Sequence, residues 1–232
     1  MRPATREGLV EGMRLGLGPG AAVFVLALSF GAGASAAGWG LALPLFFSMA
    51  AFSGSAQFAL LTTLSPGGAV SAVATAVLIN ARYLVMSVAL NDSLSGGRLR
   101  RALQAQALTD ASFVVAHQGS GRFDLPRLVG ASVPQWFFWV AGTAVGVLTR
   151  PSPELMHTLG ADVVFPAFFL MLAMDEVRRS WRALVGAALG AVTAGGLLLV
   201  TAPGNALLGA TAAALVGALP GDYPRRRRGG RR

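Results

Sequence analysis

Three long stretches without a charged residue constrain this chain more than any other feature. No Asp, Glu, Lys or Arg occurs from Leu15 to Ala81, from Leu128 to Thr149, or from Ala183 to Gly221. A helix needs roughly 20 apolar residues to cross a membrane, so these stretches have room for three, one and two spans. A shorter apolar segment, Val163 to Met174, begins just after Asp162. We therefore predict an all-α integral membrane protein, a bundle of about seven hydrophobic segments with Gly/Pro-interrupted helices in its N-terminal half.

The composition excludes several classes of function. Only 12% of the 232 residues are charged, against about 25% in soluble domains. The pI near 11.7 does not indicate a nucleic-acid partner, because the arginines flank apolar segments, where they set topology. The chain has no Cys and no Lys, which excludes disulfides, thiolate metal sites and a retinal Schiff base. It also has no phosphate-binding loop of the Gly-x-x-x-x-Gly-Lys type, and we expect no metal or other cofactor.

The charge pattern divides one transmembrane domain, 1–232, into five parts. They are a polar lead (1–14), a first helical group (15–90), a polar loop with an amphipathic helix at Ala102–His117 (91–127), a second helical group (128–220) and a basic tail (221–232).

The arginine clusters predict the topology. They lie at 98–127, 178–182 and 225–232, and one span for each later segment puts all three on one side. The positive-inside rule makes that side, and hence the C-terminus, cytoplasmic. Counting back through three spans then puts Arg2, Arg6 and Arg14 outside. Either the N-terminus is external, or one of the first three segments is re-entrant; we expect seven spans.

The stretch Phe52-Ser53-Gly54-Ser55-Ala56-Gln57-Phe58 lies near the middle of the apolar run Leu41–Leu64. Polar groups at membrane depth survive only inside the protein or beside a water-filled cavity. Transporters break helices at such points to expose backbone groups to a solute, and Gly54 has the conformational freedom for a break. The alternative is that these small residues pack a helix–helix contact. Gln57 needs a hydrogen-bonding partner in either case, so we expect it inside the bundle.

Other polar and helix-breaking residues lie within or beside the apolar segments. Pro19 and Pro166 are the expected helix breaks, and Asp162 lies one helical turn before Pro166. Arg82 lies well inside the third segment, with Asn80 close by. A charge in a span is costly and usually faces the bundle interior or water, although a long side chain can also extend to the headgroups. We expect the Arg82 guanidinium to face the bundle, near the second segment, Asp110 or Asp162.

Several of these motifs occur in the order found in one known family. They are Gly18-Pro19-Gly20 with Phe30-Gly31, the stretch Phe52–Phe58, Asn80-Ala81-Arg82-Tyr83, Leu108-Thr109-Asp110-x-x-Phe113, and Gly160-Ala161-Asp162 followed by Phe165-Pro166-Ala167. Over roughly residues 7 to 215 the chain resembles the AzlC-type branched-chain amino acid permeases.

The resemblance implies export of branched-chain amino acids across a bacterial inner membrane, by a large subunit that works with a small hydrophobic AzlD-type partner. Two positions bear on the comparison. The family commonly has a second acid after the Asp at 110, where this chain has Ala111, which argues against a paired carboxylate there. The Asn-x-Arg motif is usually followed by His or Tyr, here Tyr83.

The candidate roles follow from the chemistry of an amino acid. Arg82, or free N–H groups near Gly54, would bind the carboxylate, with Ser53, Ser55, Gln57 and Asn80 as further polar candidates. Asp110 or Asp162 would take the ammonium group or a coupling proton. Phe52 and Phe58 would line the apolar part.

Two other classes of function stay open from the sequence. One is a channel or scaffold subunit of a membrane complex. The other is an intramembrane enzyme, which the placement of both histidines, His117 and His157, in loops disfavours.

Overall fold

The computed structural model describes residues 3–119, 121–158, 160, 163, 167, 170, 173–174, 177–178, 181–201 and 203–218. They form two compact units, Met1–Phe169 and Leu170–Arg232, each described here by itself. Within the described residues the fold is helical, with one isolated antiparallel bridge between His117 and Phe123. Asp162, Pro166 and the basic tail lie outside the described residues.

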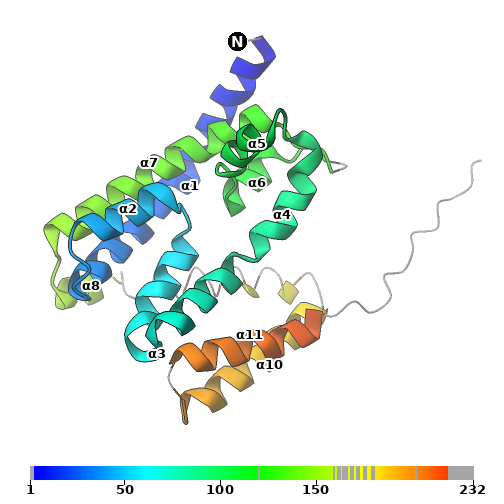
Figure 1. The fold of residues 1–232 in the computed structure, drawn as a ribbon. Helices are drawn as coiled ribbons and strands as arrows, with labels where there is room; N and C mark the ends of the chain where they lie inside the picture. Colours follow the sequence, from blue (N-terminus) through cyan, green and yellow to red (C-terminus); the bar gives the residue numbers. More distant parts are fainter. Residues whose placement is uncertain are drawn as a thin grey trace, which may run out of the picture. The chain divides into compact units, whose positions relative to one another are not determined.

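Two long helices form the frame of the first unit, α1 (Pro3–Ala36) and α7 (Leu125–Thr149). A Cβ on Gly16 would meet Ala131, and one on Gly31 would meet the backbone of Thr143. Gly130 approaches Leu9 and Gly146 approaches Leu28 in the same way. Because the contact positions advance together along both helices, α1 and α7 run parallel, as Figure 1 shows. Glycine at these positions allows the two backbones to approach closely.

One expectation for the start of the chain was wrong. Helix α1 begins at Pro3, within the polar lead, and continues into the apolar run. Pro19 does not break the helix; it lies inside α1, which continues through it. The expected close packing is present, since a Cβ on Gly20 would lie 2.7 Å from the Phe138 ring.

The second apolar segment is broken at mid-length. Helix α2 (Ala42–Ala50) ends before Phe52, whose φ of 40° is left-handed, and Ser53 is extended. Helix α3 (Gly54–Asn80) then begins, and it has a turn of its own at Gly68, with φ 74° and ψ 168°. The break is therefore at Phe52 and Ser53, and Gly54 is the first helical residue rather than the flexible point.

The chain reverses at Gly68, so that the end of α3 returns to its beginning. Ser53 Oγ donates to Asn80 Oδ1 at 2.7 Å. Helix α4 (Arg82–Leu90) follows after Ala81, and a 3₁₀ turn, η1 (Asn91–Ser93), ends this stretch. Residues 54–67 and 68–80 thus form a helical hairpin, as seen in Figure 1.

The polar loop contains two short helices where we expected one amphipathic helix. Helix α5 (Arg98–Ala105) ends before α6 (Asp110–Ala116) begins. Thr109 caps α6: its hydroxyl accepts from Ser112 N at 3.0 Å, while Ser112 Oγ accepts from Thr109 N at 2.8 Å. That capping box holds Asp110 at the first position of α6.

A short helix, α8 (Pro153–Thr158), follows α7 in the first unit. In the second unit, α10 (Trp181–Leu198) and α11 (Pro203–Ala218) pack as an antiparallel pair, with Gly190 against Ala210 and Ala214.

Four helical stretches in the described residues are long and apolar enough to cross a membrane. They are Thr5–Ala36, Gly68–Ser93, Leu125–Thr149 and Trp181–Leu198. The chain is a multi-pass membrane protein, but the count of seven segments is not confirmed. The second segment is broken into shorter helices, and most of the segment after Asp162 lies outside the described residues.

Candidate functional site

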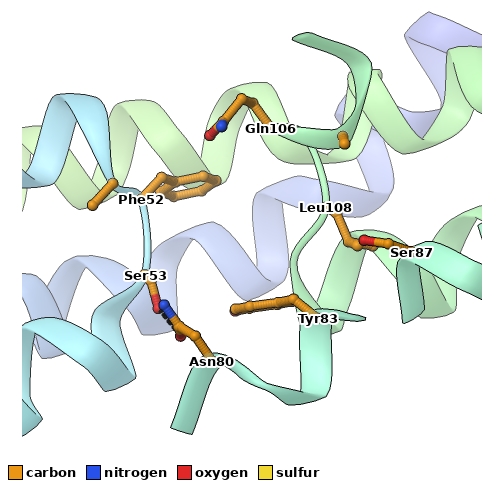
Figure 2. A pocket seen from close by; sticks show the side chains of 9 residues that line it. Phe52, Ser53, Asn80, Tyr83, Ser87, Gln106 and Leu108 are labelled. Atoms are coloured by element: carbon orange, nitrogen blue, oxygen red, sulfur yellow. Dashed lines mark hydrogen bonds between the residues drawn. The ribbon is translucent and has the colours of Figure 1, made fainter. Parts of the chain in front are cut away.

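A cavity of about 170 Å³ lies where two irregular stretches of backbone meet the junction of two helices. The irregular stretches are the break between α2 and α3 and the link between α5 and α6, and the junction is the Asn80–Ser87 part of α3 and α4. Figure 2 shows side chains converging from all three. The lining residues are Ala51, Phe52, Ser53, Asn80, Tyr83, Ser87, Ala105, Gln106 and Leu108. Of the predicted residues, Phe52, Ser53 and Asn80 line this cavity.

The cavity lies beside the middle of α7 rather than at either end. Thr109, next to the lining residue Leu108, donates through its hydroxyl to Gln135 Oε1 at 3.1 Å. At the α2 end, Trp136 Nε1 donates to the carbonyl of Met49 at 3.1 Å. Gln135 and Trp136 are about 15 Å from the start of α7 at 1.5 Å per residue, which is half of a 30 Å hydrocarbon core.

The lining is neutral, and polar groups alternate with apolar ones. Phe52, Leu108 and two alanines give apolar surface, while Ser87, Gln106 and Tyr83 carry hydroxyl or amide groups. No charged side chain is among the lining residues. Such a cavity suits a small solute that combines apolar and polar parts and has no net charge.

An ion pair lies next to the cavity. Arg82 Nη2 lies 2.8 Å from Asp110 Oδ2, and it also donates to Ser55 Oγ at 3.1 Å and to the Tyr83 hydroxyl at 3.3 Å. The guanidinium carbon lies 5.0 Å from the centre of the Tyr83 ring, a cation–π contact. The expectation that Arg82 faces the bundle near the second segment or Asp110 is confirmed. In this arrangement the charge of Arg82 is paired with that of Asp110, and neither residue is among the lining residues of the cavity.

Gln57 belongs to a closed ring of hydrogen bonds in the core. It accepts from Trp139 Nε1 at 2.7 Å and donates to Ser48 Oγ at 3.1 Å. Ser48 Oγ lies 2.7 Å from Thr143 Oγ1, whose proton goes to the carbonyl of Trp139, so Ser48 donates to Thr143. Gln57, Ser48 and Thr143 are fully buried. The hydrogen bonds of the ring join α2, α3 and α7 inside the core. The expectation of a partner for Gln57 inside the bundle is confirmed, and Gln57 is not among the cavity residues.

Two further predicted residues also pack in the core and do not line the cavity. A Cβ on Gly54 would lie 2.5 Å from Trp139 Cη2, so glycine is needed for close approach. The ring centre of Phe58 lies 5.7 Å from that of Phe30. The stretch Phe52–Phe58, which we predicted to have one role, thus has two: Phe52 and Ser53 form part of the cavity wall, whereas Gly54 and Phe58 pack in the core.

The sequence contained a signal for two lining residues that we did not select, Tyr83 and Ser87. They follow the predicted residue Asn80 at spacings of three and four residues, which is the spacing of one helix face. Gln106 and Leu108 carried no comparable signal, because the break between α5 and α6 was not predicted.

Comparison with known proteins gives one family and one relative. The family model described as "AzlC protein" matches residues 20–151, more than half of the chain. A protein of Archaeoglobus fulgidus described as "Uncharacterized membrane protein" is 32% identical over 151 residues, 62% of this chain and 64% of the relative. The alignment thus spans less than two thirds of the length of that relative. No solved structure matches the chain.

Proposed function

Because the chain belongs to the AzlC family, a membrane transport family, we propose that it is a transporter subunit that moves branched-chain or similar small apolar amino acids out of the cell. We propose secondary transport at a bacterial inner membrane, together with a small hydrophobic AzlD-type subunit. The observation that carries the proposal is the neutral cavity beside the middle of α7, where a break separates α2 from α3.

The size of the cavity supports a small solute. A dry cavity of about 150 Å³ in another protein holds benzene, so one of about 170 Å³ suits a molecule the size of a small amino acid. Phe52 and Leu108 would contact the aliphatic side chain.

The polar groups of the cavity suit a zwitterion. Ser53 directs its hydroxyl to Asn80, so it does not cap α3 and leaves the first N–H groups of that helix to a carboxylate. The Gln106 amide oxygen and the hydroxyls of Tyr83 and Ser87 are acceptors for an ammonium group. This assignment replaces Arg82 as the first candidate for the carboxylate, because Arg82 is paired with Asp110.

Efflux from cells tests the proposal. Cells that carry the chain and its partner, loaded with labelled leucine, should lose it saturably, and an uncoupler should abolish the loss. Leu108→Trp should stop efflux by filling the cavity. Val88→Trp is the matched control, because Val88 lies on the outer side of α4 and is 77% exposed.

The alternative that the sequence left open is a channel or scaffold subunit of a membrane complex. A channel would pass leucine without saturation and without response to an uncoupler, and a scaffold would tolerate Leu108→Trp. Either result would replace the exporter proposal.

A further inference from the structure

The parallel direction of α1 and α7 determines how often the chain between them crosses the membrane. We call the side with Pro3 and Leu125 the N-face and the side with Ala36 and Thr149 the C-face. Helix α1 ends at the C-face, and α7 begins at the N-face. The Glu11–Arg127 ion pair joins their N-terminal parts. The chain from 37 to 124 must therefore make one net crossing, although it contains two apolar segments.

The crossing segment is Gly68–Ser93. Its apolar length is sufficient, and its last part runs from the cavity toward the N-face, where Leu90 packs in one cluster with Ala116 and Leu128. Its middle, at Asn80 and Arg82, is at the level of the cavity.

Residues 42–67 instead reach mid-depth and turn back. Helix α2 starts six residues after α1 ends and stops near Trp136, in the middle of α7. Its nine residues span about 14 Å, half of the hydrocarbon core. After the break, α3 returns toward the C-face, with Phe58 against Phe30 and Leu61 against Gly33.

A second excursion comes from the other side. The link between α5 and α6 lies at mid-depth, where Thr109 bonds Gln135. Helix α6 then returns to the N-face, where Asp124 N donates to the carbonyl of Ala116 at 2.9 Å. The tips Ala51–Ser53 and Gln106–Asp110 therefore meet at the cavity from opposite faces.

We propose that residues 42–67 are a re-entrant hairpin from the C-face, that residues 106–116 dip in from the N-face, and that these two tips are the gates of the cavity. Each tip separates the cavity from one face. Arg82 links both, since the same Nη2 bonds Ser55 behind one tip and Asp110 in the other. A solute leaves toward a face when the tip on that side moves away.

This topology agrees with the distribution of charge and resolves the open choice at the N-terminus. A re-entrant second segment puts the N-terminus on the same side as the arginines of the polar loop. The N-face then has Arg6, Arg98, Arg100, Arg101, Arg122 and Arg127, whereas Arg150 lies at the C-face. The positive-inside rule makes the N-face cytoplasmic.

Single-cysteine labelling tests the topology, because the chain has no native cysteine. An impermeant maleimide should label Ala37→Cys, Ala69→Cys and Thr149→Cys from one face, and Glu7→Cys and Ser95→Cys from the other. All five positions are exposed. Labelling of Ala69→Cys from the face opposite to Ala37→Cys, or only after solubilisation, would overturn the re-entrant hairpin. These results do not depend on which solute is carried.

A cross-link tests the gates. In the double variant Ala51→Cys and Gln106→Cys, a bis-methanethiosulfonate cross-linker that forms a disulfide with each cysteine across the cavity should stop leucine efflux, and reductive cleavage of the two disulfides should restore it. Comparison within the same protein removes the effect of the substitutions themselves. Unchanged efflux with the linker fully in place would refute the gating role. A chain that carries no leucine would refute the proposed function and leave the labelling result standing.

Discussion

The Arg82–Asp110 ion pair should show a measurable coupling energy in a double-mutant cycle. The two side chains are 30% and 35% exposed, between a surface pair and a buried one. Surface pairs contribute about 0.2–1 kcal/mol, whereas removal of one partner of a buried pair costs about 3–5 kcal/mol. For Arg82→Gln, Asp110→Asn and the double variant we expect a coupling of about 1–3 kcal/mol in the free energy of unfolding. Each single variant leaves one charge without its partner at mid-depth.

The assay is reversible unfolding of the purified protein in mixed micelles, followed by circular dichroism. The matched control is the cycle of Glu11→Gln and Arg127→Gln, an ion pair at the end of α1 and α7 in which Glu11 is 52% exposed. Its coupling should stay below about 1 kcal/mol. If the Arg82 and Asp110 variants are additive within about 0.5 kcal/mol, the pair does not join the α5–α6 tip to the crossing segment, and the reasoning fails.

Three further predictions concern the core and the ion pair. Gln57→Leu removes the acceptor of Trp139 Nε1, so it should lower the free energy of unfolding by about 1–3 kcal/mol while membrane insertion is unaffected; unchanged stability would show that the ring is dispensable. Gly54→Ala places a methyl group 2.5 Å from Trp139 Cη2 and should lower Tm, whereas Gly18→Ala, with no atom within 4 Å, should raise it slightly; equal shifts would contradict the packing argument. Arg82→Lys should reduce efflux, because a lysine ammonium cannot stack over the Tyr83 ring as the planar guanidinium does while it bonds Ser55 and Asp110; full efflux would mean that charge alone is sufficient.

The helical class and the inward position of Arg82 could be predicted because both follow from the cost of charge in hydrocarbon. Long uncharged runs require spans, and an arginine deep in such a run requires a partner. Gln57 was predictable for the same reason, since a buried amide needs hydrogen bonds.

Other features depend on tertiary contacts and were not predictable. The sequence predicted a break near Gly54. In the structure Gly54 allows the close approach of Trp139, and the residue with the left-handed backbone is Phe52. The apolar spacing of 102–117 predicted one continuous helix, although the chain breaks before Asp110. The capping box that starts the new helix depends on two short side chains, Thr109 and Ser112, which did not stand out against the helical period around them. Pro19 lies within α1, whose close contacts with α7 extend along both sides of it.

The central claim is that the cavity binds a small apolar amino acid. Its most direct test uses Ser87→Cys in the cavity wall, with Val88→Cys, the next residue along α4 and 77% exposed, as the control for lipid-facing positions. An impermeant maleimide should label position 87 and not position 88. Leucine, isoleucine or valine should slow the labelling of position 87 saturably, and arginine or glutamate should not. Labelling of Ser87→Cys at a rate that no amino acid changes would contradict the account.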